Sequence, residues 1–127
     1  RVADLVGGLG DHLPGRRLVV EGVDRLGETS VFVDAGLLGH AIRTIFERVA
    51  STLVDEDELR VRLELASRHQ YRGVEIEFRG GAASAGGSLK AGIEMAVAEK
   101  FLQMHGAELF ERETAVRSLV VFVPLYA

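Results

Sequence analysis

The side chains best suited to metal or nucleophilic chemistry are scattered along this sequence. The chain has four histidines and no cysteine. They are His12, His40, His69 and His105, and no two of them show the i, i+4 spacing with which a helix face binds a metal. Without cysteine there is no zinc–thiolate site, no redox pair and no thiol nucleophile. The sequence therefore predicts no metal site and no catalytic residue of these kinds.

Two unusual stretches could bind charged ligands. Residues 79–88 read RGGAASAGGS, and successive N–H groups of a glycine-rich backbone can cradle a phosphate. The simpler interpretation is an exposed and mobile loop, because the stretch has no hydrophobic anchor and no periodicity. The acidic run at 55–58 is typical of a solvated turn, and it could also be a rim contact for a basic partner.

Composition narrows the class of protein. The chain has 127 residues, a formal charge of −4 and 47% hydrophobic residues, which predicts one globular domain over residues 1–127. No stretch approaches the roughly 20 apolar residues that span a bilayer, so we expect a cytoplasmic domain without membrane contact. The mild acidity argues against nucleic-acid binding, which depends on clustered cations.

The first half of the chain predicts two helices and two short strands. Apolar residues at near-helical spacing favour a short helix over 1–13, and β-branched residues favour strands over 16–23 and 30–33. Asp34 can cap the helix that follows. In that helix apolar residues recur at intervals of three and four, namely at Leu38, Ala41, Ile42, Ile45, Val49 and Ala50.

The second half predicts a hairpin, a loop, a helix and two strands. Strict alternation over 59–66 and 74–78 indicates two antiparallel strands, and the loop over 79–88 follows. The next helix ends at Gly106, and the face expected to be buried carries Ile93, Ala96, Val97, Phe101 and Met104. Strands are expected around 108–111 and 118–125. The predicted fold class is α+β, a two-layer α/β sandwich whose mixed, mostly antiparallel sheet is covered on one face by about three helices.

Four strings in this order resemble the histidine kinase-like ATPase domain, the Bergerat fold shared with gyrase B and MutL. VDAGLLGHAIRTIFERVAS is similar to the helix that carries the family's Asn motif, and VEIEF is similar to the strand before the first Gly box. LKAGIEMAVAEKFLQMHGAEL resembles the second Gly box with its helix, and LVVFVPL resembles the closing strand. The resemblance covers nearly the whole chain and implies an ATP-binding domain of a sensor histidine kinase.

The resemblance also implies a nucleotide site whose key residues are substituted here. In the family, Asn side chains on the first long helix bind Mg²⁺, and an Asp in the first Gly box accepts the adenine amino group. The matching positions are Thr44, Arg48 and Gly80, with Gly81 next to the last of these. Arg48 has no acceptor for a metal. It could bind phosphate directly, although a surface arginine at the edge of a helix is the simpler interpretation.

The second Gly box and the nucleotide lid are altered in the same way. Gly92 keeps one glycine of the box, and Glu94 replaces the other with a carboxylate that would repel a triphosphate. Residues of the 79–88 loop and its continuation, among them Gly86, Gly87 and Lys90, stand where the family has its lid. Glu47 is one position from the expected register, about 100° around the helix, and is interpreted as solvated surface.

The resemblance and its substitutions together lead to three hypotheses. The first is a degenerate ATPase domain of a two-component signalling protein, with lost or weak Mg-ATP binding and no cofactor. It would act as a regulatory module for a histidine kinase, a receiver domain or a phosphotransfer domain. The second is a divergent but active kinase that binds ATP and magnesium, and the third is the C-terminal domain of a histidine phosphotransfer protein. In each case we expect a fragment of a longer protein, whose upstream helices would carry any dimerisation.

Overall fold

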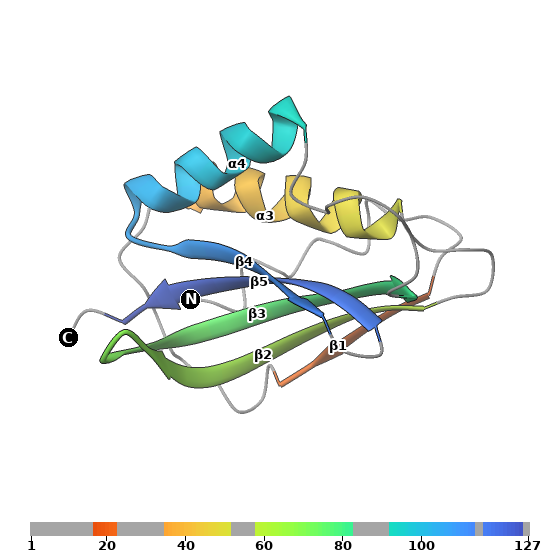
Figure 1. The fold of residues 1–127 in the computed structure, drawn as a ribbon, viewed down its shortest axis with the longest axis horizontal. Helices are drawn as coiled ribbons and strands as arrows, with labels where there is room; N and C mark the ends of the chain where they lie inside the picture. Colours follow the sequence, from red (N-terminus) through yellow and green to blue (C-terminus); the bar gives the residue numbers. More distant parts are fainter. Residues whose placement is uncertain (1–16, 23–34, 52–57, 83–91, 114–115, 126–127) are drawn as a thin grey trace.

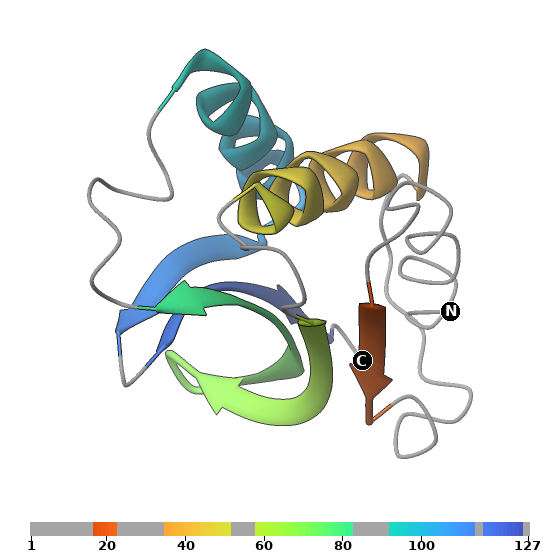
Figure 2. The same cartoon turned by 90° about the vertical axis from the view of Figure 1, so that its right-hand side faces the viewer.

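A five-stranded sheet with two helices packed on one face forms the described part of the molecule (Figures 1 and 2). The computed structural model describes residues 17–22, 35–51, 58–82, 92–113 and 116–125. In chain order the elements are β1 (Arg17–Glu21), α3 (Ala35–Ala50), β2 (Glu58–Arg68), β3 (Tyr71–Ala82), α4 (Ile93–Met104), β4 (Glu108–Glu113) and β5 (Val116–Pro124).

The sheet is mixed and mostly antiparallel, as the sequence predicts. Its strand order is β1-β2-β3-β5-β4, and only the β1–β2 pair is parallel. A parallel pair needs a crossover connection, and α3 lies on the connection between these two strands. The α+β two-layer sandwich is therefore confirmed. The helix expected over 1–13 and the strand expected over 30–33 lie outside the described residues, as does Asp34. No helix in the described ranges has the length and apolarity to cross a membrane.

The predicted stripe on α3 forms the centre of the core. Its apolar side chains recur at intervals of three and four, so they share one face of the helix and are fully buried between the sheet and α4. They are the predicted Leu38, Ala41, Ile42, Ile45 and Val49, together with Phe46, while the predicted Ala50 is 8% exposed. Burying a large apolar side chain contributes about 1.5–3 kcal/mol relative to leaving it exposed. The opposite side of α3 remains free to carry polar groups.

The β2–β3 hairpin follows from the alternation of its two strands. Val61 pairs with Phe78 and Leu63 with Ile76, and all four side chains point into the core. The turn places two non-glycine residues, His69 and Gln70, at φ angles of 53° and 70°. This left-handed geometry matches the twist of a two-residue hairpin.

The loop expected over 79–88 begins later than the sequence indicates. Residues 79–82 belong to β3, where Arg79 pairs with Ser118 and Ala82 with Val116 across an irregular step of the ladder. The glycines Gly80 and Gly81 lie at this irregularity, a common position for glycine in strands. Hydrogen bonding to β5 extends the strand although the segment has no hydrophobic pattern. The rest of the expected loop lies outside the described residues.

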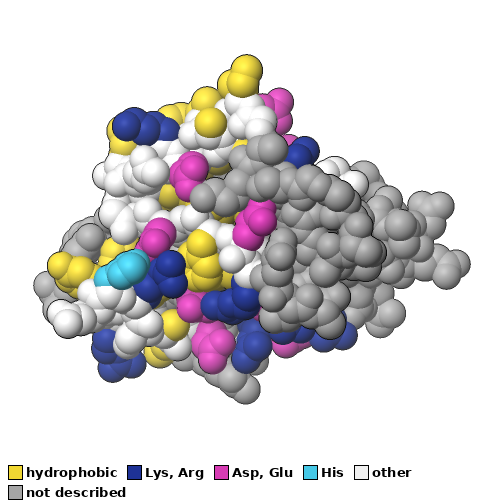
Figure 3. Space-filling model, in the orientation of Figure 1, with side chains coloured by type: hydrophobic (Ala, Val, Ile, Leu, Met, Phe, Trp, Pro, Cys, Tyr) yellow, Lys and Arg dark blue, Asp and Glu magenta, His cyan; other side chains and the backbone are white. Residues whose placement is uncertain are grey.

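The buried face of α4 differs from the expected one. Of the expected residues, only Phe101 packs against the core, and it is partly buried. Ala96 is exposed, and Ile93, Val97 and Met104 are 83%, 43% and 62% exposed. The buried residues are Met95, Ala98 and Leu102. Both sets follow helical spacing, so the pattern alone cannot choose between them. Packing against α3 and β4 makes the choice. Figure 3 shows hydrophobic side chains on the outer surface of α4 at the top of the view.

The predicted end of α4 at glycine is confirmed. Gly106 has a φ of 71°, a conformation that glycine adopts without a Cβ clash. The Ala107 N–H donates to the Leu102 carbonyl over 2.9 Å, and the Gly106 N–H donates to the Gln103 carbonyl over 3.1 Å. This pair of hydrogen bonds is the Schellman arrangement that ends a helix and directs the chain into β4.

Candidate functional site

A pocket of about 480 Å³ lies between the last turns of α3 and the start of α4. This volume falls in the range of roughly 300–1,000 Å³ found for small-molecule sites. Its walls come from two helices that are far apart in the sequence. The described lining residues are Thr44, Glu47, Arg48, Ser51, Gly92, Ile93, Glu94 and Met95.

Four of the residues singled out from the sequence meet in this pocket. Thr44 and Arg48 come from α3, and Gly92 and Glu94 come from the start of α4. The remaining candidates are not among the described lining residues. Gly80 and Gly81 are part of β3, and three lie outside the described residues, namely Gly86, Gly87 and Lys90.

Sequence reasoning missed Glu47 and Ser51. Glu47 was expected at the solvated surface, and it is exposed, yet it also lines the pocket. The available signal was the helical stripe that starts at Thr44, because residues three, four and seven positions later share its face. That stripe is Thr44, Glu47, Arg48 and Ser51, none of which belongs to the buried stripe.

Both hydroxyl groups in the pocket donate their protons to the backbone of α3. Thr44 Oγ1 donates to the His40 carbonyl over 3.1 Å, and Ser51 Oγ donates to the Arg48 carbonyl over 2.6 Å. A hydroxyl has one proton to donate and two lone pairs that accept. Toward the pocket, these two side chains therefore offer acceptors.

The start of α4 forms the opposite wall. Gly92 is the N-cap residue, with a φ of 107°, and no side chain caps the helix by a hydrogen bond. The Ala96 N–H donates to the Gly92 carbonyl over 3.1 Å. Glu94 stands in the first turn, where a carboxylate compensates the partial positive charge of a helix N-terminus.

The charges of the described lining do not suit a polyphosphate. Glu47 and Glu94 supply two carboxylates and Arg48 supplies one guanidinium, which gives 1 − 2 = −1. Arg48 also stands in the last turn of α3, where a cation interacts favourably with the helix dipole. This lining repels anions more than it attracts them.

The lining also does not fit a magnesium ion. Mg²⁺ requires oxygen ligands in near-octahedral geometry. At the position that the resemblance assigns to the metal, Arg48 offers only N–H donors. Within the described ranges, no group of three His, Asp or Glu side chains lies close enough to hold any metal ion.

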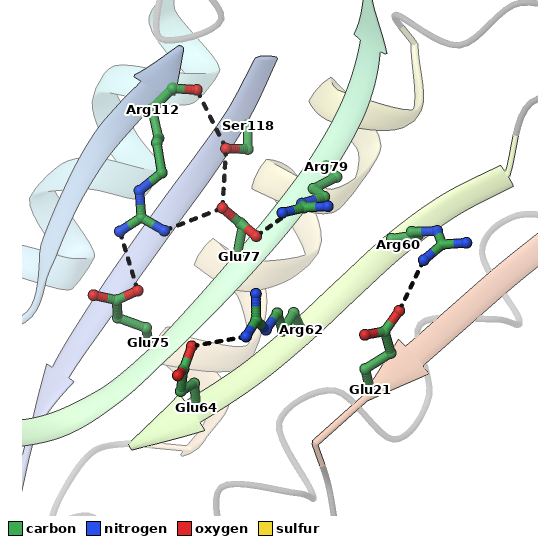
Figure 4. Close-up of polar contacts among 9 residues, drawn as sticks. All are labelled: Glu21, Arg60, Arg62, Glu64, Glu75, Glu77, Arg79, Arg112 and Ser118. Atoms are coloured by element: carbon green, nitrogen blue, oxygen red, sulfur yellow. Dashed lines mark hydrogen bonds and ion pairs between the residues drawn. The ribbon is translucent and has the colours of Figure 1, made fainter. Parts of the chain in front are cut away.

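A second polar region covers the sheet face that points away from the helices (Figure 4). Glu77 is only 5% exposed and accepts three hydrogen bonds. The donors are Arg79 Nε at 3.0 Å, Arg112 Nη1 at 3.2 Å and Ser118 Oγ at 3.3 Å. Arg112 also donates to Glu75 over 3.2 Å. We call these five residues the Glu77 network.

The same face continues toward the hairpin with a second ion-pair group. Arg68 donates to Glu108 over 2.9 and 3.2 Å, and its guanidinium lies 4.0 Å from the centre of the Phe110 ring. The hydrogen bond from Arg68 lowers the pKa of Glu108, assisted by a contact from His69 at 3.2 Å. In Figure 3 basic, acidic and hydrophobic side chains alternate over the described strands.

Comparison with known proteins identifies the fold. No protein-family model matches the sequence, and a search of curated proteins finds no match. Among solved structures, the mycobacterial sensor histidine kinase MprB matches with a TM-score of 0.67 at 15% identity, over 97% of this chain and 92% of that chain. The catalytic domain of the histidine kinase ThkA, in a nucleotide-free form, matches with a TM-score of 0.68 at 8% identity, over 97% and 90%.

A third solved structure with a similar fold is also a histidine kinase. The Acinetobacter baumannii histidine kinase AdeS matches with a TM-score of 0.64 at 15% identity, over 99% of this chain and 64% of that chain. These identities are low, so the likeness concerns the arrangement of helices and strands. The chain has the histidine kinase-like ATPase fold that its sequence predicts.

Proposed function

We propose that residues 1–127 form one degenerate histidine kinase-like ATPase domain of a two-component signalling protein. The domain acts as a regulatory or protein-binding module, and it has lost Mg-ATP binding or retains it only weakly. Its partners are signalling proteins: a histidine kinase, a receiver domain or a phosphotransfer domain. The proposal rests on one observation, the presence of Arg48 with two carboxylates in the pocket between α3 and α4.

The chemistry of that pocket supports the loss of Mg-ATP binding. A guanidinium about 4 Å from a divalent cation repels it by roughly 2 kcal/mol in bulk water, and by more in a partly enclosed pocket. Glu47 and Glu94 add repulsion against the phosphates. The hydrophobic frame that shapes the pocket is intact, since the α3 stripe is fully buried. Substitution is therefore concentrated where ligands would bind.

The pocket volume favours one alternative, a divergent kinase that still binds nucleotide. A space of about 480 Å³ is large enough for a small ligand. Arginine forms strong bidentate pairs with phosphate, so Arg48 would replace the metal as the countercharge. This alternative requires that the attraction of Arg48 for the phosphates exceed the repulsion from Glu47 and Glu94.

A nucleotide titration with and without magnesium separates the two functions. We expect no saturable binding of Mg-ATP up to millimolar concentration by isothermal titration calorimetry. Arg48→Asn should restore measurable binding, because an amide oxygen can ligate Mg²⁺. Arg43→Asn is the matched control, since Arg43 is an exposed arginine of α3 that is not among the described lining residues. Micromolar affinity of the unmodified chain would end the proposal in favour of the active kinase.

A further inference from the structure

We propose that the pocket between α3 and α4 binds the basic side chain of a protein partner, an arginine in the first instance. This inference rests on the proposed function and gives the protein-binding module a location and a ligand class. The volume of the pocket suits a small ligand, and most of its polar groups suit a cation. A guanidinium group on an aliphatic chain meets repulsion from Arg48, but it can pair with Glu47 and Glu94, which together outweigh that single positive charge.

Charge is the first argument. The two carboxylates of the described lining exceed its single guanidinium, so the net charge is −1. Within the described ranges, neither Glu47 nor Glu94 has a hydrogen-bond or ion-pair partner for its carboxylate. A carboxylate that remains unpaired at a pocket wall gains a charge-assisted hydrogen bond when a cationic donor enters.

The direction of the hydrogen bonds is the second argument. Thr44 and Ser51 donate their protons to carbonyl groups of α3. Their remaining capacity is to accept, and the carboxylates of Glu47 and Glu94 also accept. Four of the five polar side chains of the described lining therefore match a donor ligand. Arginine presents five N–H donors in a planar fork and no acceptor.

The apolar wall is the third argument. Ile93 is 83% exposed beside the pocket, and Met95 of the same turn also lines it. An arginine side chain covers apolar surface with its aliphatic stem while its head stays with polar groups. Ile93 thus offers a surface for the stem, and Glu94, next to it, offers an acceptor for the head.

The helix N-terminus does not reverse this preference. The start of α4 carries a partial positive charge of roughly half a unit. The full negative charge of Glu94 stands in that same first turn. The sum at this wall is negative, so the wall attracts a cation.

An NMR titration of the 127-residue chain with argininamide tests the proposal. We expect saturable amide shifts at residues 44–51 and 92–95 that weaken as salt is added. Citrullinamide, which keeps the α-amino group and almost the same shape but lacks the guanidinium charge, should give at least fivefold weaker binding. Glu47→Gln and Glu94→Gln should each weaken argininamide binding by about 1.5- to fivefold, the range of exposed ion pairs.

The matched control is Glu64→Gln, which removes the same charge from an exposed glutamate on the other face of the sheet. It should leave argininamide binding unchanged, and circular dichroism of each variant checks the fold. The proposal is overturned if argininamide shifts no pocket amide, if citrullinamide binds equally well, or if the control weakens binding as much as the pocket variants. It is also overturned if inorganic pyrophosphate saturates the same amides at lower concentration.

The argininamide titration and the nucleotide titration test the two proposals separately. If the chain binds neither Mg-ATP nor argininamide, the proposed loss of nucleotide binding stands and this inference is wrong. A chain that binds Mg-ATP at micromolar concentration contradicts the proposed function, and the argininamide titration without nucleotide still decides the inference.

Discussion

The Glu77 network and the pocket between α3 and α4 use the same residue types with opposite results. In the network, Glu77 is almost fully buried and accepts from two arginines and a serine within 3.3 Å. In the pocket, Glu47 and Glu94 are exposed, and the described residues supply no partner for their carboxylates. A buried carboxylate that already accepts hydrogen bonds is costly to remove, because its donors lose their partner. Exposed acceptors around a cavity are available to a ligand.

This contrast shows why charged residues alone do not locate a site. The outer sheet face is rich in arginine and glutamate, but their opposite charges neutralise one another in ion pairs (Figure 4). The pocket has fewer charges, but they do not balance. Four predictions test the contrast, starting with the largest expected effect.

Removing the core beneath the pocket should have the largest effect. Phe46→Ala deletes a fully buried ring on the α3 stripe, and we expect the free energy of unfolding to fall by about 3–5 kcal/mol. Chemical denaturation measures this change. A loss below about 1 kcal/mol would contradict the assignment of Phe46 to the centre of the core.

Breaking the Glu77 network should have the next largest effect. Glu77→Ala leaves Arg79, Arg112 and Ser118 without their shared acceptor, and we expect a loss of about 1–3 kcal/mol in the free energy of unfolding. Glu64→Ala is the matched control, because its pair with Arg62 at 3.4 Å is exposed and contributes about 0–1 kcal/mol. Equal losses in the two variants would remove the distinction between buried and exposed acceptors.

Acid should weaken the Arg68–Glu108 pair. The hydrogen bond from Arg68 lowers the pKa of Glu108 in the folded chain, so the pair stabilises the fold at pH values above the unfolded pKa of 4.5. That stabilisation is lost as the pH falls through the lowered folded value. Because both side chains are about one third exposed, we expect a contribution below about 1 kcal/mol.

The measurement compares unfolding at pH 7 and pH 3 for the unmodified chain and for Arg68→Met. The variant should lose less stability on acidification, since its Glu108 has no guanidinium partner. If both proteins lose the same amount, the pair does not contribute to the acid sensitivity.

Neutralising the pocket should have the smallest effect on stability. Glu47→Gln changes an exposed side chain without a described partner, and we expect a change within about 0.5 kcal/mol in the free energy of unfolding. Thermal denaturation followed by circular dichroism measures it. A loss above 1 kcal/mol would mean that Glu47, like Glu77, contributes to the stability of the fold.

Local patterns were sufficient for most of the fold. The alternation over β2 and β3, the apolar stripe of α3 and the glycine at the end of α4 each fall within one element. Their period or conformation is set by the backbone of that element alone. The substitution of Arg48 and Glu94 at the positions implied by the family resemblance was also visible in the sequence, and both residues line the pocket.

Three features needed the packed molecule. Leu102 rather than Met104 is buried on α4 because α3 and β4 select one of two apolar faces. β3 continues to Ala82 because β5 supplies a hydrogen-bonding partner. Ser51 and Ile93 line the same pocket although they are far apart in the chain. Within the described ranges, neighbouring residues set whether a segment is a helix or a strand, because the period of each element is a local property. Contacts between distant elements set where β3 ends, which faces are covered and which polar groups share a cavity.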